Sequence, residues 1–357
     1  MRRNYLFLAT RDDALVQAAG LIDLWTAGYI EPMIPPPQLW HILAQQLMAL
    51  ALQEQGIGRQ DWLHWVSHVP AFAQLSMAQI DALVQWMLHQ QILSDDHGVL
   101  WLGRAGEETY GRRHFLALFS VFTSPPLFTV LHGRAELGFV DAMTFLGTQD
   151  GPRALLLGGR AWLVTHVDWQ HRVAYVKATE TQGRSRWQGE RPGLGFRLCQ
   201  SIKHRLAGDD DCTMWSTRAR QQIAAIRKEF VWLDTEGTVV LLAKHGTGEW
   251  WTFAGTGANA MLASAWSQAM EHRVTYDSFT VTCEASVSRH TVERALGALR
   301  AHKVRETSVA VEDAAIDGLK FSGCLPRDLA RDMLRTRLCD PQAVHDILEQ
   351  PVRCVAV

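Results

Sequence analysis

The sequence lacks the phosphate-binding loop of the common ATPases. No GxxxxGK[ST] motif occurs in its 357 residues, and no glycine is followed directly by a lysine. Because that loop cradles the phosphates of ATP, we exclude a P-loop ATPase within this chain. The GxSxG turn of the α/β-hydrolases is also missing, so the sequence offers no nucleophile elbow.

Long apolar runs are missing as well. None approaches the roughly 20 residues that a membrane-spanning helix needs, and the short apolar stretch 5–10 is followed by Arg11, Asp12 and Asp13, which is too early for a signal peptide. With 47% hydrophobic residues the chain still buries substantial cores, and its length predicts two or three domains. We therefore expect a globular, cytoplasmic protein without a membrane partner.

Cysteine is scarce and scattered. The six cysteines form no CxxC pair, and the fifteen histidines include no HExxH motif. These are the ligand spacings typical of zinc sites, so we predict no bound metal. The cysteines are Cys199, Cys212, Cys283, Cys324, Cys339 and Cys354.

Residues 151–230 concentrate positive charge and tryptophan in an otherwise acidic chain. They contain fourteen Lys or Arg against seven Asp or Glu, a formal charge of +7, whereas residues 1–150 carry −6 and residues 231–357 carry −3. Arg and Lys follow phosphates, and bases stack on indole rings, so this segment indicates a nucleic-acid surface. Of its tryptophans, Trp162 and Trp169 lie in apolar strand runs, which favours core packing for both.

The first third of the chain predicts a short strand at 5–9, a helix at 12–28 and, after the Pro-rich linker 32–37, three helices and a hairpin. Three helices and a hairpin are typical of a winged helix. These elements span 38–55, 59–69, 77–91 and 93–102. The third helix offers Gln79, Gln85, His89 and Gln90 but no Arg or Lys, so we expect it to pack against neighbouring domains rather than read bases.

The rest of the chain mixes short strands with helices. Runs separated by Gly or Pro predict a barrel or curled sheet, and they span 127–132, 154–157, 161–167 and 172–177. Beyond them the pattern predicts strands at 230–233 and 239–243, and helices at 198–206, 216–230, 256–271, 288–302 and 326–338. The expected fold is α+β and multidomain: a winged helix, then a β-barrel-like domain, then a mixed α/β C-terminal region.

Gly255 to Ala260 matches the GxGxxA fingerprint of dinucleotide-binding domains. The other βαβ repeats of such a domain are not present in the pattern. We therefore interpret the segment as a tight strand-to-helix turn whose first helical amides could meet a phosphate.

Seven stretches of the chain follow one another in a distinctive order: LATRDDALVQAAGLIDLWTAGYIEP at 8–32, LWHILAQQLMALAL at 39–52, YGRRHFLALFSVFTSPPLFTVLHGRAELG at 110–138, LLGGRAWLVTHVDWQHRVAYV at 156–176, SRWQGE at 185–190, WWTFAGTGANAMLA at 250–263 and LKFSGCLPRDLARDMLRTRLCD at 319–340. In order and spacing they resemble the large helicase-related (Lhr-like) superfamily 2 DEAD/DEAH-box helicases, in the part that follows their last ATPase motif. The resemblance covers nearly the whole chain.

Members of that family place two RecA-like motor domains first, then a winged helix, then a β-barrel-containing domain that grips the single strand. The resemblance implies a remnant of the second motor domain at 1–32, a winged-helix domain at 38–120, a β-barrel-like nucleic-acid-binding domain at 121–272 and an α/β region at 273–357. ATP-dependent 3′–5′ helicase activity belongs to the family, with ATP and Mg²⁺ in the missing motor domains. We therefore expect no catalysis and no cofactor in this chain alone, and as partners single-stranded or tailed DNA, or an RNA–DNA hybrid, and a separate motor subunit.

Strand gripping needs stacking rings beside backbone cations. Our first choice for a stacking residue is Trp187, flanked by Arg184 and Arg186, and our second is Trp215, which precedes the helix with Arg218 and Arg220. Further phosphate-binding candidates are Arg160, Arg191, Arg227 and Lys228.

Two alternative functions remain open. Winged helices joined to a β-barrel also serve base excision, in which a carboxylate such as Asp168 or Glu190 would activate water near an extruded base. That function requires a carboxylate with a raised pKa beside an aromatic pocket. The other alternative is a structural unit that docks onto a motor subunit without touching nucleic acid, for which DNA binding would be absent or insensitive to salt.

Overall fold

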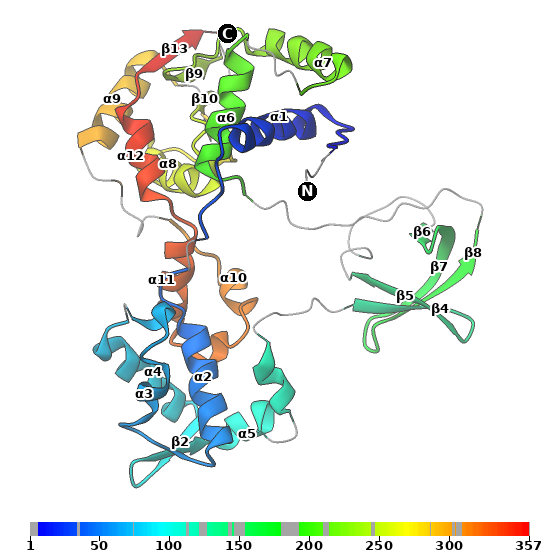
Figure 1. Cartoon of the computed structure of the whole chain (residues 1–357), viewed down its shortest axis with the longest axis vertical. Coiled ribbons are helices and arrows are strands. Elements are labelled where there is room, and N and C mark those ends of the chain that lie inside the picture. Colours follow the sequence, from blue (N-terminus) through cyan, green and yellow to red (C-terminus); the bar gives the residue numbers. More distant parts are fainter. Residues whose placement is uncertain are drawn as a thin grey trace. The chain divides into compact units, whose positions relative to one another are not determined.

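The computed structural model describes residues 6–33, 36–73, 75–111, 114–120, 127–141, 145, 154–179, 193–209, 214–243, 247–285, 287–301, 304 and 309–356. The protein has mixed α and β structure. It divides into two compact units, which we describe separately: unit 1 comprises residues 1–119 and 192–357, and unit 2 comprises residues 120–191. Figure 1 shows both, coloured along the chain.

The first part of unit 1 is a group of helices around a small antiparallel sheet. Helices α2 (Trp40–Gln53), α3 (Trp62–Val66) and α4 (Met77–His89) pack with strands β1 (Ile57–Gly58), β3 (Val99–Leu102) and β2 (Leu93–Asp96), in that strand order. The 3₁₀ turn η1 (Pro70–Phe72) precedes α4, and α5 (Arg104–Tyr110) and the 3₁₀ turn η2 (Phe115–Phe119) follow β3. Apolar side chains at helical spacing on α2 and α4 are fully buried, among them Leu43, Leu47, Leu83 and Met87.

A small polar network fixes the hairpin between β2 and β3. Asp95 accepts hydrogen bonds from Arg59 Nη1 at 2.7 Å and from the amide of Gly98 at 2.8 Å, and these bonds keep the pKa of Asp95 below its usual range. His97 and Gly98 have φ angles of 51° and 84°, as the type I′ turn of a two-residue hairpin loop requires. The helices and the hairpin predicted between residues 38 and 102 are confirmed, with shorter ends.

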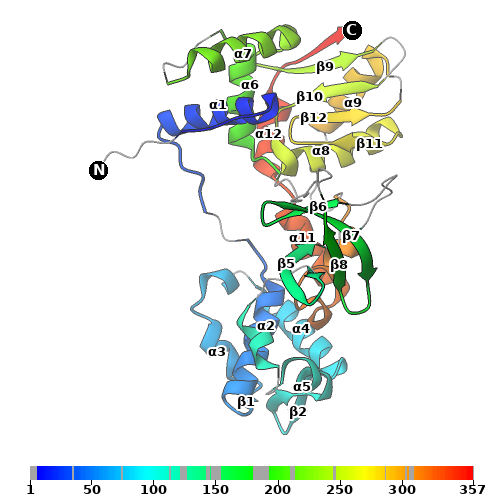
Figure 2. The ribbon, with the colours of Figure 1, turned by 90° about the vertical axis from the view of Figure 1, so that its right-hand side faces the viewer.

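A five-stranded sheet forms the second part of unit 1. Its order is β11 (Val274–Tyr276), β12 (Thr280–Cys283), β10 (Gly248–Trp251), β9 (Thr238–Leu242) and β13 (Val352–Ala356), and β13 runs parallel to β9. Figure 2 shows β11, β12, β10 and β9 side by side. Trp250 and Trp251 are consecutive in β10 and so point to opposite faces: Trp250 lies 5.3 Å from Trp266 between ring centres, and Trp251 lies 5.1 Å from Trp232.

Helices cover both faces of this sheet. On the side of Trp250 lie α8 (Gly255–Met270), α9 (Arg289–Ala301) and α12 (Pro341–Glu349). On the side of Trp251, a second core joins α1 (Asp12–Thr26), α6 (Phe196–Ala207) and α7 (Thr217–Arg227), which continues into the 3₁₀ turn η4 (Lys228–Phe230). Between α9 and α12 the chain forms α10 (Asp313–Asp317), η6 (Ser322–Cys324) and α11 (Arg327–Arg337), and there α11 contacts α2 while η6 contacts α2 and α4.

Helix α1 is an integral part of unit 1. A Cβ built on Gly20 would lie 2.9 Å from Ile202 Cγ1 of α6, Ser201 Oγ donates to the carbonyl of Gly20 at 2.9 Å, and Arg205 binds both carboxylate oxygens of Asp23. The helix predicted at 12–28 is confirmed. The strand predicted at 5–9 is wrong for its described part, 6–9, which pairs with no described strand. The apolar face of α1 is covered by α6 and α7.

Unit 2 is a curled, half-barrel sheet of five strands. The order is β5 (Ala135–Asp141), β4 (Leu127–His132), β8 (Val173–Ala178), β7 (Arg160–Asp168) and β6 (Ala154–Leu157), and β4 and β8 are parallel. Phe128, Val130, Leu155, Trp162 and Val176 form the core of its inner face. The four predicted strands of this region are confirmed, and β5 is an additional one.

The predicted limits of the β-barrel-like domain, 121–272, differ from this division. Strands β9 and β10 lie inside that range but pair with β13 and β12, which lie beyond it. Because backbone hydrogen bonds join these strands, residues 193–272 belong to unit 1 together with the C-terminal region. The strand predicted at 230–233 is wrong: the chain leaves η4 as a turn there, with Phe230 and Trp232 against Trp251.

Candidate nucleic-acid interface

The positive segment 151–230 is divided between the two units. Residues 151–191 belong to unit 2 and carry seven basic and three acidic side chains, a charge of +4; residues 192–230 belong to unit 1 and carry seven basic and four acidic ones, a charge of +3. The predicted site residues therefore fall in separate bodies. Four of them, Arg184, Arg186, Trp187 and Arg191, lie outside the described residues, so our first choice for a stacking residue stays a prediction.

Trp215 is part of the core of unit 1. Its side chain is 6% exposed and packs with Val16, Ile202 and Ile223. The guanidinium of Arg205 lies 5.2 Å from the centre of the indole ring while it also binds Asp23. A cation and the core thus cover the ring, and no face of it is open to a base. The structure argues against Trp215 as a stacking residue.

The four cations predicted on the helix after Trp215 differ in their availability. Arg218 and Lys228 are exposed, near the first and last turns of α7. Arg227 donates through Nε to the carbonyl of Arg205 at 2.8 Å, which ties the end of α7 to α6. Arg220 buries its Nε, which finds no hydrogen-bond partner among the described residues. Only Arg218 and Lys228 fit the role of mobile phosphate contacts.

In unit 2 the structure separates the predicted residues into core and surface. Trp162 is 8% exposed and donates from Nε1 to the carbonyl of Leu157 at 3.1 Å, which confirms its predicted place in the core. Trp169 is 50% exposed, although its ring forms a T-shaped pair with Phe128 at 5.0 Å between centres. Arg160 is exposed at the start of β7. Arg160 therefore remains a candidate contact of unit 2.

Sequence analysis missed a surface that the curled sheet creates, which we call the outer face: Phe139, His166, Tyr175 and Lys177. The register pairs His166 of β7 with Tyr175 of β8, and their rings stack at 6.1 Å between centres with planes 28° apart. Tyr175 also pairs with Leu131 of β4, and Thr129, two residues before Leu131, pairs with Phe139 of β5. The exposed fractions are 39% for Tyr175 and 55% for Phe139.

The outer face follows from strand alternation. Successive side chains of a strand point to opposite faces, so on β8 Ala174 and Val176 enter the core while Tyr175 and Lys177 point outward and are exposed. Lys177 lies on the same side as Tyr175, about 7 Å further along the strand. Both residues could have been identified from the sequence, because alternate side chains of the strand predicted at 172–177 must point to opposite faces. Phe139 had no such signal, because β5 itself was not predicted.

The strand-to-helix turn at Gly255 is confirmed, but its amides are occupied. Gly255 adopts a φ of 81° at the start of α8. Its amide donates to the carbonyl of Ser278, and the amide of Thr256 donates to the carbonyl of Leu194, both at 3.0 Å. The segment before α6 thus caps this helix. Those two amides are therefore not free to donate hydrogen bonds to a phosphate.

Asp168 does not have the property that base excision would need. It accepts from the amide of His171 at 2.9 Å and contacts His171 Nδ1 at 2.8 Å, and these hydrogen bonds lower its pKa. A water-activating carboxylate near an extruded base needs the opposite shift. Glu190, the other carboxylate of that hypothesis, lies outside the described residues.

Potential metal ligands do not converge in the described ranges. His64 and His68 stand four residues apart, a spacing that the sequence analysis overlooked, yet no three His, Cys, Asp or Glu side chains of the described residues are placed to share an ion.

No helix of the described part of the chain is long and apolar enough to cross a bilayer. Comparisons with protein-family models, with curated proteins and with solved structures find no match.

Proposed function

We propose that this chain binds single-stranded nucleic acid and acts as the C-terminal, strand-gripping half of an Lhr-like helicase whose motor is not part of it. The observation that carries the binding proposal is the outer face of unit 2. There, exposed aromatic rings and a lysine share one side of a curled sheet. Curled sheets and barrels bind single strands by stacking bases on such rings while cations follow the phosphates. The Lhr-like part of the proposal rests on the seven sequence stretches.

The arrangement favours sequence-independent binding. Aromatic stacking accepts every base, because every base has a π-face. Arg134, Arg160, Arg172 and Lys177 are exposed cations of unit 2, whereas Glu136 is an exposed carboxylate near the β4–β5 turn. Lys177 would contact phosphates on the outer face, whereas Arg160 lies on the same side of β7 as the buried Trp162. Arg184, Arg186 and Trp187 lie outside the described residues and stay predictions. Such a surface holds a strand without reading it, as a translocating helicase requires.

The first part of unit 1 supports the winged-helix element of the proposal. Helices α2, α3 and α4 precede the β2–β3 hairpin, and β1 completes a three-stranded sheet. On α4, Trp86 donates from Nε1 to the carbonyl of Gly323 at 3.4 Å, so η6 covers part of this helix. We therefore assign α4 to packing within unit 1 rather than to base recognition.

The test is fluorescence anisotropy of a labelled single-stranded 20-mer, titrated with the full chain at several salt concentrations. We expect binding that weakens as salt rises, because each neutralised phosphate releases counterions. Tyr175→Ala should weaken binding by about 1–3 kcal/mol, the contribution of one stacked base. The affinities for RNA and for an RNA–DNA hybrid, titrated in the same way, show which type of nucleic acid the chain prefers.

Tyr276→Ala is the matched control. Tyr276 is 48% exposed on β11, so the substitution removes a similar ring from a strand of unit 1 and should leave the affinity unchanged. If the folded wild-type chain fails to bind at low salt, the binding proposal is wrong. Equal losses for the two tyrosine variants would refute the role of the outer face.

Docking onto a motor subunit is a second candidate function. Leu6 and Leu8 precede α1 and Ile30 follows it, and they are 84%, 84% and 87% exposed; a motor subunit that docks there would remove these apolar side chains from water. Nucleic-acid binding that is absent, or insensitive to salt, in the same titration would favour docking over strand gripping.

A further inference from the structure

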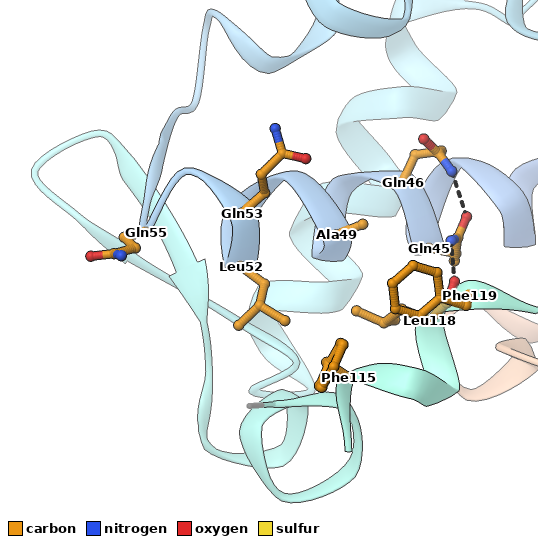
Figure 3. A pocket seen from close by; sticks show the side chains of 9 residues that line it. All are labelled: Gln45, Gln46, Ala49, Leu52, Gln53, Gln55, Phe115, Leu118 and Phe119. Atoms are coloured by element: carbon orange, nitrogen blue, oxygen red, sulfur yellow. Dashed lines mark hydrogen bonds between the residues drawn. The ribbon is translucent and has the colours of Figure 1, made fainter. Parts of the chain in front are cut away.

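A pocket of about 800 Å³ opens between α2 and η2 in unit 1 (Figure 3). Small-molecule sites usually measure about 300–1,000 Å³. Ala49 is one of its lining residues, and its short side chain leaves the space open. Figure 3 shows Gln46 and Gln53 on one side of Ala49 along α2, and Leu52, Phe115 and Leu118 on the other. The pocket thus has one wall of amides and one wall of apolar side chains.

The hydrogen bonds of the amide wall determine which side-chain atom of Gln46 has no partner within the wall and can bind a ligand. The carbonyl of Leu118 only accepts, so the atom of Gln45 that meets it is the donor Nε2. Gln45 Oε1 therefore faces Gln46 and accepts from Gln46 Nε2 at 2.7 Å. Gln46 Oε1 is left as an acceptor at the pocket. At the far end of the wall, Gln53 donates to Glu54 at 2.8 Å, which likewise leaves Gln53 Oε1 as an acceptor.

The apolar wall offers aromatic surface. Phe115 and Phe119 come from η2 and lie 5.8 Å apart between ring centres with planes 69° apart. Phe119 is 76% exposed and Phe115 is 44% exposed, a large exposure for two neighbouring phenyl rings. Planar rings stack on such side chains.

The described lining of the pocket carries no charged side chain. The residues that line it, Gln45, Gln46, Ala49, Leu52, Gln53, Gln55, Phe115, Leu118 and Phe119, include no acid and no base. Among the described lining residues a phosphate or carboxylate would find no cation, and a purely apolar ligand would leave the amide oxygens unpaired. The occupant that fits is a neutral, flat, heteroaromatic ring whose amino group donates to the open oxygens.

We propose that the α2–η2 pocket binds a nucleobase that carries an exocyclic amine, with its ring against Phe115 or Phe119 and its amine at Gln46 Oε1. As a pocket for one base of a bound strand, this inference rests on the proposed function. The same chemistry is offered by a free nucleoside, so the experiment separates the two sources. Cytosine and thymine provide the contrast, because both are pyrimidines but only cytosine has the amine.

The experiment compares the affinity of the full chain for single-stranded (dC)₁₂, (dT)₁₂ and free cytidine by isothermal titration calorimetry. We expect (dC)₁₂ to bind about fivefold more tightly than (dT)₁₂. Ala49→Leu fills the pocket and should weaken (dC)₁₂ binding about tenfold. Gln46→Leu removes the acceptor and should make the two oligonucleotides equal. Phe119→Ala, which removes a ring that is 76% exposed, should weaken the binding of both oligonucleotides.

Ala78→Leu is the matched control, since Ala78 is exposed on α4 away from the pocket; it should behave as the wild type. If the oligonucleotides bind but Ala49→Leu and Phe119→Ala match the wild type, the pocket inference is overturned and the proposed function stands. Cytidine binding that Ala49→Leu abolishes, without oligonucleotide binding, supports the pocket and refutes strand gripping. Binding of none of the three ligands overturns both.

Discussion

Replacing Gly20 by alanine tests whether α1 belongs to the fold of unit 1. In the interior of a helix, Gly→Ala gains about 1 kcal/mol of helix propensity. Against this gain, the new Cβ would stand 2.9 Å from Ile202 Cγ1 and 3.3 Å from the backbone nitrogen of Ile202. Neither atom is the end of a flexible chain, so α1 and α6 must move apart, at about 1–3 kcal/mol. We expect a net loss of about 1 kcal/mol in the free energy of unfolding, measured by urea denaturation.

Gly297 provides the control for this substitution. It lies in α9, and a Cβ built there would meet no heavy atom within 4 Å. Gly297→Ala therefore keeps the propensity gain alone and should stabilise the protein by about 1 kcal/mol. The two variants should differ by about 2 kcal/mol. A Gly20→Ala protein as stable as Gly297→Ala would show that α1 does not pack on α6 as described.

Two further predictions concern buried side chains. Trp215→Ala should lower the free energy of unfolding by about 3–5 kcal/mol, visible in the urea midpoint; a stable variant that only loses nucleic-acid affinity would contradict the burial of the indole. His41 is 4% exposed, and burial, followed by the charge of Arg337, lowers its pKa to about 4. Its unfolded form takes up a proton near pH 6.5 and its folded form only near pH 4, so stability should fall as pH drops through that window, by about 3 kcal/mol at most. In His41→Gln, denaturation curves at pH 7 and pH 4.5 should lie closer together than in the wild type.

The sequence predicted local structure better than it predicted which elements come together. Helices α2, α4, α8 and α11 show helical apolar spacing, β4 is bounded by Pro and Gly, and β7 is preceded by two glycines, so each was located within a few residues. Strands β11 and β12 were missed although they lie close in the chain and pair with each other. Strand β13 was missed because its pairing with β9 joins segments as distant as 239 and 353, which no local pattern reveals. For the same reason the predicted boundary at 272 cuts through a continuous sheet.

The candidate site shows the same division between local and tertiary information. The sequence around a tryptophan beside arginines is the same whether the indole ring stacks on a base or fills a core. Trp215 fills a core because α1, almost 200 residues earlier, supplies Val16 against it and Asp23 for Arg205. Tyr175 and Lys177 were within reach of strand periodicity, whereas the pocket beside Ala49 depends on η2 folding back onto α2.

The interrupted course of unit 1 has a consequence for how the molecule folds. Its ladders and helix contacts join residues far apart in the chain, such as Gly20 with Ser201 and Trp86 with Gly323, whereas unit 2 pairs strands within residues 127–178. Folding slows as contacts span longer stretches of chain, and domains tend to fold as units. Unit 2 can therefore fold early, as a complete domain, before the two flanking segments of unit 1 have formed their contacts with each other.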